Sequence, residues 1–538
     1  MITDLVRYGM ERLHSRTLTT PARWASQHIV VGNPFPGPLQ YTHHPWMREM
    51  INAEAEVCVG QKAAQLGYST LAVAVALYTV VEGRNVLYLL PTRVPDASDF
   101  SISRFDKIID SSEYLTEMFA VNKNVGVKRA TTGTIYIRGM NSNSALKSVD
   151  VSLLVFDEVD EMAQGKIPLA QQRLAGQLIK RSWYVSTPTI PDFGINALLK
   201  ESTESHFFFP CPSCSRHVEL LWPDAFELCG ESHTDPDCAR SHIKCPECTK
   251  KLPHETKAEW LAPAKFQPTR QSDALGFYIN QLYSATRLPV ELARAYFRAQ
   301  IDIAAEQEFW NSMMGLARLL QGSRLEDEDL TKCYGNYRCS DPPPANRLIT
   351  IGIDIGKLLH YWVDSWIYDQ PCADINLASF SRTITAGTLD NFSEIKNLIT
   401  QFSPAQIVID SEPETRKALE MVAYYPGLIN LCKFTRGDVD NTLTGDIIVK
   451  ANRTAWLDTA LSRFRTQRTT IPLDLPRDVF AHAKALVRRY RQTDTGDLAS
   501  HYVSTGADHF MFARVYSEIA FPLAIARYHN RDLKELLP

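Results

Sequence analysis

The feature that most constrains the fold is a series of short apolar runs between residues 55 and 186. Helical segments or loops separate these runs, which lie at 55–60, 86–90, 134–138, 152–156 and 182–186. Near-continuous apolar strands that alternate with helices are typical of a parallel sheet with both faces covered. The sequence therefore predicts an α/β domain in this part of the chain.

Composition excludes several classes of protein. The 538 residues, 45% hydrophobic and 22% charged, are ordinary for a globular chain and at roughly 100–200 residues per domain predict three or four domains. No apolar run reaches the roughly 18–20 residues of a membrane span, and the N-terminus lacks the apolar stretch of a signal peptide. We therefore expect an intracellular protein without membrane contact. The net charge of −4 excludes a generally basic DNA coat protein but allows a local basic track.

Changes in sequence texture divide the chain into parts. Residues 1–40 are expected to form a helical arm, and 41–325 a first α/β domain, which a cysteine-rich segment interrupts at 205–262. Residues 326–346 are acidic and then proline-rich, as is typical of a linker. A second α/β domain is expected over 347–538. It begins with three successive strands, expected to be antiparallel, and continues with a helix and a further strand.

A strand, a loop and a helix are expected over VCVGQKAAQLGYSTLAVAVALY. In the usual phosphate loop, GxxxxGK[ST], a lysine precedes the hydroxyl residue, but here Tyr68 stands in that place and Lys62 lies at the other end of the loop. Such a loop needs a cation that reaches the phosphate oxygens and a hydroxyl for Mg²⁺, next to free backbone N–H groups. Around Gly67, Lys62 can supply the charge and Ser69 the hydroxyl, with Thr70 as a substitute. Alone, the pattern also fits a tight strand–helix turn.

An acidic pair follows the apolar run SLLVF. Asp157 and Glu158 would lie at the carboxyl end of a buried parallel strand, where open α/β sheets bind ligands. There, Asp157 can hold Mg²⁺ and Glu158 can polarise the attacking water. The alternative is a surface acidic cluster, because Asp160 and Glu161 follow directly.

Hydroxyl residues end the next apolar run, SWYVSTPT. At this strand end, residues 186–189 could sense the γ-phosphate and transmit its loss to neighbouring parts, although alone they also fit a turn. After a phosphate loop and an acidic pair, their position is that of a helicase-like coupling motif.

Two CPxC pairs, Cys211 with Cys214 and Cys245 with Cys248, are separated by 30 residues. Two such turns place four thiolates around one ion, which suits a closed structural Zn²⁺ site. The alternatives are a redox dithiol or a site that uses other nearby ligands. Those ligands are Cys229, Cys238, His206, His217, His233 and His242.

Three aspartates mark the second domain. Asp354 ends the strand LITIGIDIG, Asp410 ends the strand AQIVID, and Asp508 opens a helical stretch. Clustered carboxylates can hold two divalent ions roughly 4 Å apart across a scissile phosphate, and the element order resembles an RNase H-like nuclease. The alternative is that these residues cap turns, with Asp508 as a helix N-cap. Competing ligands are Asp364, Glu412, Asp438 and Asp446.

In this order, the motifs resemble those of the tailed-phage large terminases, with the lambda-like branch closest. The resemblance rests on QKAAQLGYST with its early lysine, on LLVFDE and STPT, on the CPxC pairs followed by GFYINQLYS, and on IGIDIG, IVIDSE and DHFMFARVY. It covers about residues 41–520. The third nuclease motif varies in this branch, so the resemblance supports Asp508 less firmly than the other acids.

The resemblance implies a P-loop (ASCE-type) ATPase with an inserted zinc ribbon, followed by an RNase H-like nuclease domain. The residues expected to bind ATP and Mg²⁺ are Lys62, Gly67, Ser69 and Thr70. The acids expected to drive ATP hydrolysis and to hold nuclease Mg²⁺ or Mn²⁺ are Asp157, Glu158, Asp354, Asp410 and Asp508. Tyr41 or Trp46 would stack on adenine. An arginine finger is expected, with Arg93, Arg129 and Arg138 as candidates.

The implied activity is a motor that uses ATP to thread double-stranded DNA into a procapsid and cuts concatemeric DNA with a two-metal nuclease. The implied partners are a small terminase subunit, the portal and further copies of the chain in a ring, in the host cytoplasm. The alternatives are a helicase-like DNA translocase without nuclease activity, an RNase H-like recombinase or resolvase, and a structural DNA adaptor of the capsid.

A basic stretch, AKALVRRYRQ, is expected to be a helix that contacts DNA phosphates. Lys484 and Arg488 are four residues apart and would share one side of the helix. Arg489 and Arg491 add charge, and the alternative is a solvated helix face. Two weaker candidates are Lys180 and Arg181.

Overall fold

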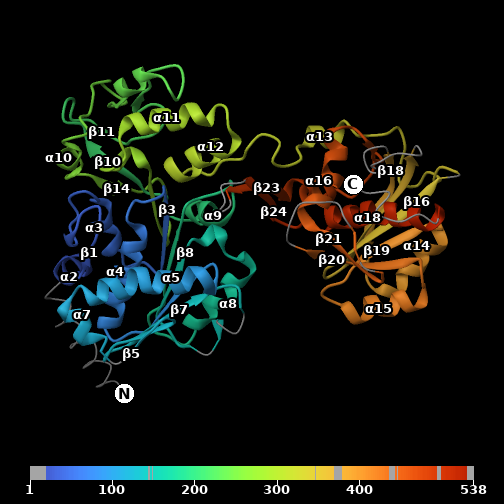
Figure 1. The fold of residues 1–538 in the computed structure, drawn as a ribbon, viewed down its shortest axis with the longest axis horizontal. Helices are drawn as coiled ribbons and strands as arrows, with labels where there is room; N and C mark the ends of the chain where they lie inside the picture. The colour runs from blue at the N-terminus through green and yellow to red at the C-terminus, as the bar shows by residue number, and fades with distance from the viewer. Residues whose placement is uncertain are drawn as a thin grey trace. The chain divides into compact units, whose positions relative to one another are not determined.

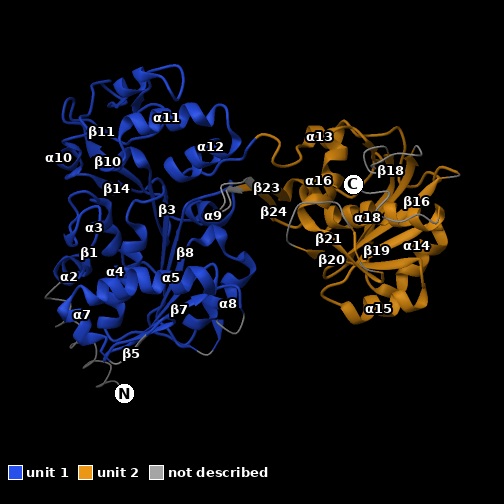
Figure 2. Cartoon of the chain, in the orientation of Figure 1, with its two compact units in different colours: residues 1–320 blue, residues 321–538 orange. Residues whose placement is uncertain are grey.

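The computed structural model describes residues 20–120, 122–142, 146–147, 149–345, 347–368, 379–435, 443–444, 446–492 and 498–529. The chain divides into two compact units, residues 1–320 and 321–538 (Figure 2). Of the helical arm expected over 1–40, residues 1–19 lie outside the described part. In the remainder, α2 (Pro21–His28) is followed by the short hairpin of β1 (Val30–Val31) and β2 (Gly37–Pro38).

An eight-stranded sheet organises the first unit (Figure 1). In spatial order its strands are β15 (Leu275–Ile279), β3 (Val57–Lys62), β9 (Arg181–Ser186), β8 (Leu153–Asp157), β4 (Val86–Leu90), β7 (Thr134–Gly139), β6 (Val127–Arg129) and β5 (Asn122–Asn124). The six strands from β15 to β7 run parallel, and β6 and β5 are antiparallel. Each predicted apolar run is a strand, so the predicted parallel sheet is confirmed.

Both faces of this sheet are buried, as the continuous apolar runs predict. Alternate residues of β4 enter different cores: Tyr88 packs with α4 (Tyr68–Val81) on one face, whereas Leu87 and Leu89 pack with α9 (Gly194–Glu201) on the other. The shorter helices of the unit surround these layers. They are α3 (Trp46–Ile51), η1 (Arg93–Ala97), α5 (Ser98–Phe100), η2 (Ser101–Asp106), α6 (Lys107–Asp110), α7 (Glu113–Met118), η4 (Val159–Glu161), η5 (Gln164–Lys166), α8 (Ile167–Gln171) and η6 (Gln172–Leu174).

The cysteine-rich segment lies between α9 and β15. Its elements are β10 (His206–Pro210), β11 (His217–Val218), β12 (Phe226–Glu227), η7 (Pro236–Arg240), β13 (His242–Ile243), α10 (Lys257–Leu261) and β14 (Lys265–Gln267). After it, the chain returns to the central sheet as β15, a strand that the sequence analysis did not predict. A helical region then follows as η8 (Gln281–Tyr283), α11 (Pro289–Ala299), α12 (Ile303–Gln307) and η9 (Glu308–Met313).

A seven-stranded mixed sheet organises the second unit. In spatial order its strands are β21 (Ile448–Asn452), β20 (Ile429–Thr435), β19 (Gln406–Asp410), β16 (Leu348–Ile355), β17 (Leu359–Tyr368), β18 (Ser379–Leu389) and β22 (Thr469–Thr470). The β16–β17–β18 meander is antiparallel, which confirms the predicted arrangement of the first three strands. Strand β19 runs parallel to β16, so Asp410 and Asp354 end neighbouring strands on the same edge.

Helices cover both faces of the second sheet. Helices α16 (Arg453–Arg465) and α18 (His509–His529) pack on one face, and η10 (Phe392–Glu394), α14 (Ile395–Phe402) and α15 (Thr415–Tyr424) pack on the other (Figure 1). Helix α18 crosses β16 very closely at Gly352, where an added Cβ would lie 2.0 Å from the Ala513 carbonyl oxygen. Only glycine allows this approach, which brings the first turn of α18 to the end of β16.

Two segments differ from expectation. The segment expected to be a linker packs on the second unit: α13 (Asp327–Thr331) buries Leu330, and the Tyr337 hydroxyl donates to the Thr383 carbonyl over 2.8 Å. The basic stretch is not one helix. It begins in α17 (Asp478–Ala485) and continues as β23 (Leu486–Gln492), paired with β24 (Leu498–Ser504).

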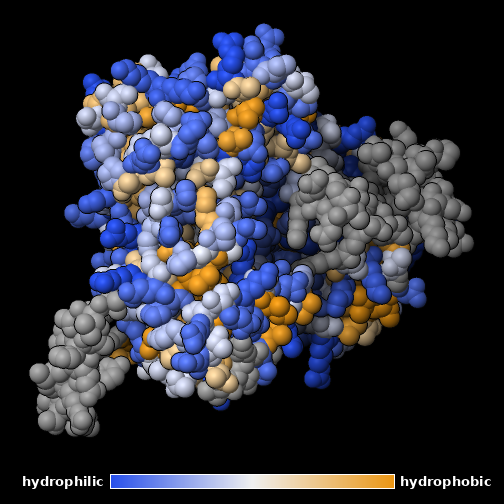
Figure 3. All heavy atoms as spheres, turned by 60° about the vertical axis from the view of Figure 1, so that its left-hand side comes forward, coloured by the Kyte–Doolittle hydropathy of each residue, from blue (hydrophilic) through white to orange (hydrophobic). Residues whose placement is uncertain are grey.

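Among the described residues, no helix is both long enough and apolar enough to cross a membrane. The face drawn in Figure 3 is mostly hydrophilic, and its hydrophobic side chains form small separate patches.

Candidate functional site

The loop between β3 and α4 has the form of a phosphate cradle. Gly67, whose φ of +82° favours glycine, turns the chain into α4, and an added Cβ there would lie 2.9 Å from Met47 Sδ. The Ala64 N–H is occupied by a 2.7 Å bond to the Ser312 carbonyl. In contrast, the N–H groups of residues 65–70 have no hydrogen-bond acceptor within the described parts of the chain. Six free donors at a helix N-terminus are suited to bind phosphate.

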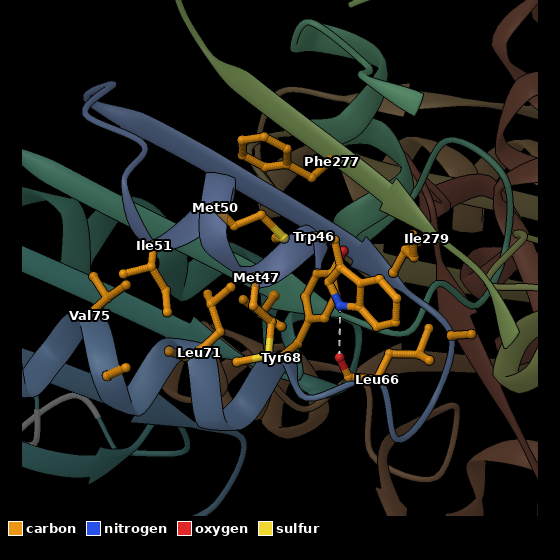
Figure 4. Close-up of a cluster of buried hydrophobic side chains, with 14 of the residues drawn as sticks. Trp46, Met47, Met50, Ile51, Leu66, Tyr68, Leu71, Val75, Phe277 and Ile279 are labelled. Atoms are coloured by element: carbon orange, nitrogen blue, oxygen red, sulfur yellow. Dashed lines mark hydrogen bonds between the residues drawn. The ribbon is translucent and has the colours of Figure 1, made fainter. Parts of the chain in front are cut away.

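Tyr68, which replaces the usual loop lysine, points away from this cradle. Its side chain is 1% exposed and packs under β3, where an added Cβ on Gly60 would lie 2.7 Å from the Tyr68 ring (Figure 4). Trp46, fully buried beside it, donates its indole N–H to the Leu66 carbonyl over 3.1 Å (Figure 4). These aromatic residues therefore support the loop from inside the core, and Trp46 has no exposed ring face on which adenine could stack.

Lys62, the predicted phosphate-binding cation, lies at the opposite end of the loop and points toward the strand ends that carry Glu158 and Thr187. Its ammonium lies 3.1 Å from Glu158 Oε1 and 3.2 Å from Thr187 Oγ1. These partners follow β8 and β9, so the cation connects the carboxyl ends of three neighbouring strands. The side chain of Lys62 is only 7% exposed, whereas that of Glu158 is 40% exposed.

Asp157 is fully enclosed at the end of β8. The Tyr88 hydroxyl donates to its Oδ2 over 2.6 Å, whereas its buried Oδ1 has no hydrogen-bond partner among the residues that the structure describes. Burial raises the pKa of Asp157 to about 6, and the neighbouring Glu158 carboxylate contributes to this rise. A buried carboxylate oxygen without a partner fits a divalent cation, and Ser69 lies close enough to act on the same carboxyl.

Glu158 and the hydroxyl motif lie together. Glu158 has a φ of +64°, a strained conformation for this residue type, and its Oε2 accepts a 3.4 Å hydrogen bond from Ser186 Oγ. The structure therefore brings Glu158 to the strand end that carries Ser186 and Thr187.

Asp160 is not a surface acid, contrary to the alternative considered above. It is 3% exposed, and its carboxylate accepts hydrogen bonds from the Thr189 N–H and hydroxyl at 2.8 and 2.6 Å and from the Ile195 N–H at 2.7 Å. Asp160 thus links the acidic loop to the hydroxyl motif and to the start of α9.

Other residues expected at the nucleotide site are placed as follows. Tyr41 is partly buried, and its hydroxyl donates to the Ala22 carbonyl over 2.7 Å. Arg138 lies over the Tyr136 ring at 5.3 Å, whereas Arg93 and Arg129 are exposed. The adenine contact and the arginine finger remain predictions.

The four CPxC cysteines form one compact cluster. The Sγ atoms of Cys211 and Cys248 are 3.9 Å apart, as are those of Cys214 and Cys245. Tetrahedral thiolates at Zn–S distances of about 2.3 Å are separated by about 3.8 Å, so this cluster fits a zinc ion. The other candidate ligands are not in the cluster: Cys238 donates to the Ser232 carbonyl, and His206 pairs with Glu219 at 2.6 Å.

In the second unit, Asp354 and Asp410 end adjacent strands. Burial raises the pKa of Asp354, and Asp508 adds to this rise. Burial also raises the pKa of Asp410 to about 6, with a further contribution from the charge of Asp354. Asp508 precedes α18 and accepts a hydrogen bond from Ser504. Asp354 therefore lies near each of the other two acids. Among the described residues, however, the three carboxylates do not form a group whose ligand atoms all lie within 4.8 Å of one another.

Histidines, which the sequence analysis did not single out, complete this acidic site. His509 Nδ1 lies 2.8 Å from Asp354 Oδ2, and its ring stacks on that of His360 with a centroid distance of 4.7 Å. Asp354, His360 and His509 each offer one ligand atom within 4.8 Å of the others. The sequence contained one signal for His360. In the predicted antiparallel meander, a tight turn after Asp354 places His360 opposite Asp354 on the next strand.

The competing acids are placed elsewhere. Asp364 is fully buried and pairs with Arg514 at 3.1 Å, so it belongs to the core. Glu412 pairs with Lys433 at 2.9 Å near the surface, and Asp446 is exposed. Asp438 lies outside the described residues.

The predicted DNA-binding helix face is wrong, because its residues belong to two elements. Lys484, in α17, pairs with Asp327 at 2.9 Å, and Arg488, in β23, pairs with Asp458 at 2.8 Å. Alternating apolar and basic residues in VRRYR suit a strand better than a helix face. Arg489 is buried, and the side chain of Arg491 lies outside the described part. Arg181 is held by the Ala53 carbonyl, whereas Lys180 is exposed.

Comparison with protein families bears on the first unit. Residues 33–265, which contain the loop, both strand-end motifs and the cysteine cluster, match the family described as phage terminase large subunit gpA, ATPase domain. The match assigns this region of the chain to an ATPase domain of that kind.

Three solved structures that are similar to this chain are distant from it in sequence. The HK97 bacteriophage large terminase is 12% identical and aligns over 94% of this chain and 99% of its own, with a TM-score of 0.49. A large terminase from a thermophilic bacteriophage is 10% identical over 86% of this chain and 94% of its own, with a TM-score of 0.29. The large terminase nuclease of the thermophilic phage G20c is 16% identical over 33% and 84%, with a TM-score of 0.21. No curated protein sequence matches the chain significantly.

Proposed function

We propose that this chain is a phage terminase large subunit. It would couple ATP hydrolysis in the first unit to the movement of double-stranded DNA into a procapsid, and cut that DNA at the acidic site of the second unit. The observation that carries the motor part is the meeting of Lys62, Asp157, Glu158 and Thr187 beside six free N–H groups. These groups supply charge, metal ligand, base and phosphate donors in one place.

The residues of the first unit divide the chemistry between them. The N–H groups of 65–70 would bind the phosphates, and Asp157 Oδ1 with the Ser69 hydroxyl would hold Mg²⁺, with Thr70 as the substitute for Ser69. Bound Mg²⁺ neutralises charge that develops on the phosphate oxygens. Glu158 would orient and deprotonate the attacking water.

Lys62 has two competing partners in this proposal. Without nucleotide it pairs with Glu158 at 3.1 Å. A γ-phosphate offers the ammonium a more highly charged partner, so phosphate binding would free the Glu158 carboxylate for catalysis. The same exchange would loosen Thr187, which Lys62 contacts at 3.2 Å.

Loss of the γ-phosphate can be transmitted from this site. The Thr189 carbonyl accepts 2.8 and 3.2 Å bonds from Asn311 Nδ2 and the Arg318 N–H, near the end of the first unit. Together with the bonds of Asp160 to Thr189, this forms a continuous polar connection from the acidic loop to residues 311–318. We propose that this connection couples hydrolysis to DNA movement.

The motor is tested by ATPase and packaging assays on Lys62→Ala, with the exposed Lys107→Ala as the matched control. Lys62→Ala should abolish both DNA-dependent ATP turnover and the protection of DNA from nuclease by procapsids. Full packaging by Lys62→Ala would contradict the proposal. The assay needs procapsids, portal and the small terminase subunit, which are the partners proposed here, with a ring of terminase copies on the portal in the host cytoplasm.

The nuclease part rests on Asp354, Asp410 and Asp508, which would hold two Mg²⁺ or Mn²⁺ ions. It is tested by plasmid cleavage with either ion by wild type, Asp354→Ala and Asp410→Ala. Cutting by the wild type alone supports the nuclease. ATP turnover without cutting under any divalent ion would favour the helicase-like translocase, and cutting without ATP turnover would favour a recombinase or resolvase.

We also propose that Cys211, Cys214, Cys245 and Cys248 bind a structural Zn²⁺ ion in a zinc ribbon. The support is the pair of 3.9 Å sulfur separations. A closed shell of four thiolates leaves no open position for substrate, so this ion would stabilise the insertion.

A further inference from the structure

We infer that the cutting site binds a divalent transition-metal ion, such as Mn²⁺, through Asp354, His360 and His509, in preference to Mg²⁺. This inference rests on the proposed nuclease function, because it assigns metal ligands and metal preference to the same site. It adds two imidazoles to a site expected to contain carboxylates alone.

The backbone fixes two of the ligands opposite each other. Asp354 on β16 and His360 on β17 are directly paired residues of an antiparallel ladder, so their side chains project from the same face of the sheet. Asp354 is only 6% exposed. Backbone pairing and the burial of Asp354 therefore fix these two side chains next to each other.

Helix α18 brings the third ligand to this pair. Its first residue, His509, lies against Gly356, where an added Cβ would be 3.2 Å from His509 Cε1. One turn later, α18 crosses β16 at Gly352, next to the Ala513 carbonyl. Two glycines without side chains thus allow α18 to hold His509 within 2.8 Å of Asp354.

A third histidine supports the arrangement without joining it. His482 Nδ1 accepts the Phe510 N–H over 3.2 Å, and its ring centroid lies 5.8 Å from that of His360 and 6.0 Å from that of His509. This bond to the first turn of α18 fixes the residue that follows His509. Among the described residues, the ligand atoms close enough to share an ion in this unit are those of Asp354, His360 and His509.

The ligand types determine which ion the site prefers. Mg²⁺ prefers oxygen ligands and retains its water, whereas imidazole nitrogen suits first-row transition metals. Two imidazoles and one carboxylate leave positions open for water and for a DNA phosphate oxygen. Asp410, at the end of the neighbouring strand, can complete the oxygen side of the site.

The test measures the binding of Mn²⁺ to the metal-free full chain by electron paramagnetic resonance. In the same samples, the electron spin echo shows modulation from ¹⁴N when an imidazole is bound directly to Mn²⁺. The variants are His360→Gln and His509→Gln. The control is His482→Asn, whose amide oxygen can still accept the Phe510 N–H. The thiolate cluster does not interfere, because soft sulfur ligands disfavour Mn²⁺. All chains in this test carry Asp157→Asn, which removes the carboxylate proposed above to hold a divalent ion in the first unit.

We expect ¹⁴N modulation in the wild type, its loss in the double variant, and at least about tenfold weaker Mn²⁺ binding in each single variant. His482→Asn should bind as the wild type does, and a large excess of Mg²⁺ should be needed to displace Mn²⁺. Melting curves identify any variant that has not folded. His360→Asn or His509→Asn then replaces the corresponding glutamine variant.

Bound Mn²⁺ without ¹⁴N modulation, or unchanged binding and cutting in the double variant, would overturn the inference and reduce His509 to an ion-pair partner of Asp354. The nuclease would still stand if Asp410→Asn failed to cut. Conversely, cutting by Asp410→Asn would overturn the nuclease proposal itself, whatever the Mn²⁺ signal.

Discussion

The two units place acids at equivalent positions but surround them with different groups. In the first unit, Asp157 ends the parallel strand β8, and in the second unit Asp354 and Asp410 lie at the ends of the neighbouring parallel strands β16 and β19. Both positions are at the edge where α/β sheets bind ligands. In the first unit, the acids meet the ammonium of Lys62 and hydroxyl groups; in the second, Asp354 meets two imidazoles. The comparison shows that strand-end position predicts where chemistry occurs, whereas the facing groups determine which chemistry it is.

The largest difference between the units should appear in Glu158→Gln. The amide keeps the shape of the side chain but cannot accept a proton, so ATP turnover should fall by about 10²–10⁴-fold. Plasmid cleavage should be unchanged. Glu161→Gln, at an exposed position of the same loop, is the control. Residual turnover above about a tenth of wild type would assign the base to another residue.

The acids of the second unit should separate into catalytic and structural ones. Asp364 accepts hydrogen bonds from Thr383 and Ser517 at 2.8 Å and pairs with buried Arg514. Asp364→Asn leaves that cation less neutralised and should reduce stability by about 3 kcal/mol. Calorimetry should show an earlier melting transition with unchanged ATP turnover. Glu412→Gln, near the surface, should change stability by less than about 0.5 kcal/mol; equal losses in both variants would refute this distinction.

The zinc proposal distinguishes the first unit from the second. Cys245→Ser should reduce bound zinc from one ion per chain to a small fraction and destabilise the first unit, because Cys211 and Cys245 are buried in its core. Metal analysis by atomic emission measures this directly. Cys229→Ser should retain the zinc. A variant chain that loses no zinc would point to a different ligand set.

A smaller effect is expected from Tyr88→Phe, which removes the 2.6 Å hydrogen bond to Asp157. ATP turnover at limiting Mg²⁺ should fall about tenfold, because an oriented hydrogen bond to a charged group contributes about 1.5 kcal/mol or more. The raised pKa of Asp157, about 6, means that the carboxyl takes up a proton as pH falls through that value. Turnover should therefore decline below about pH 6, and the decline should begin at higher pH in Tyr88→Phe. An unchanged pH profile would contradict this role.

Much of the first site could be predicted from sequence, because its residues lie in short continuous motifs. The loop, the acidic pair and the hydroxyl motif each contain their own strand end, and parallel strands bring these ends together. Tyr88 could not be found in this way, since its contact with Asp157 depends on the order of β4 and β8 in the sheet. Likewise, β15 is separated from its neighbour β3 by more than two hundred residues.

The second site was only half predictable. Asp354 and Asp410 follow the strand-end rule, but His509 reaches them through the packing of α18 at Gly352. The basic stretch was predicted wrongly for a different reason. Its charges have helical spacing and suggested a helix face, whereas pairing with β24 makes Arg488 part of a strand. Tertiary pairing overrides local spacing in such short polar segments.

The measurement that tests the central claim most directly is a crossed assay of Glu158→Gln and Asp410→Asn for both ATP turnover and DNA cleavage. The account predicts that Glu158→Gln cuts DNA but does not turn over ATP, and that Asp410→Asn turns over ATP but does not cut. If both variants lose both activities while remaining folded, the two sites are not separate centres and the account is contradicted.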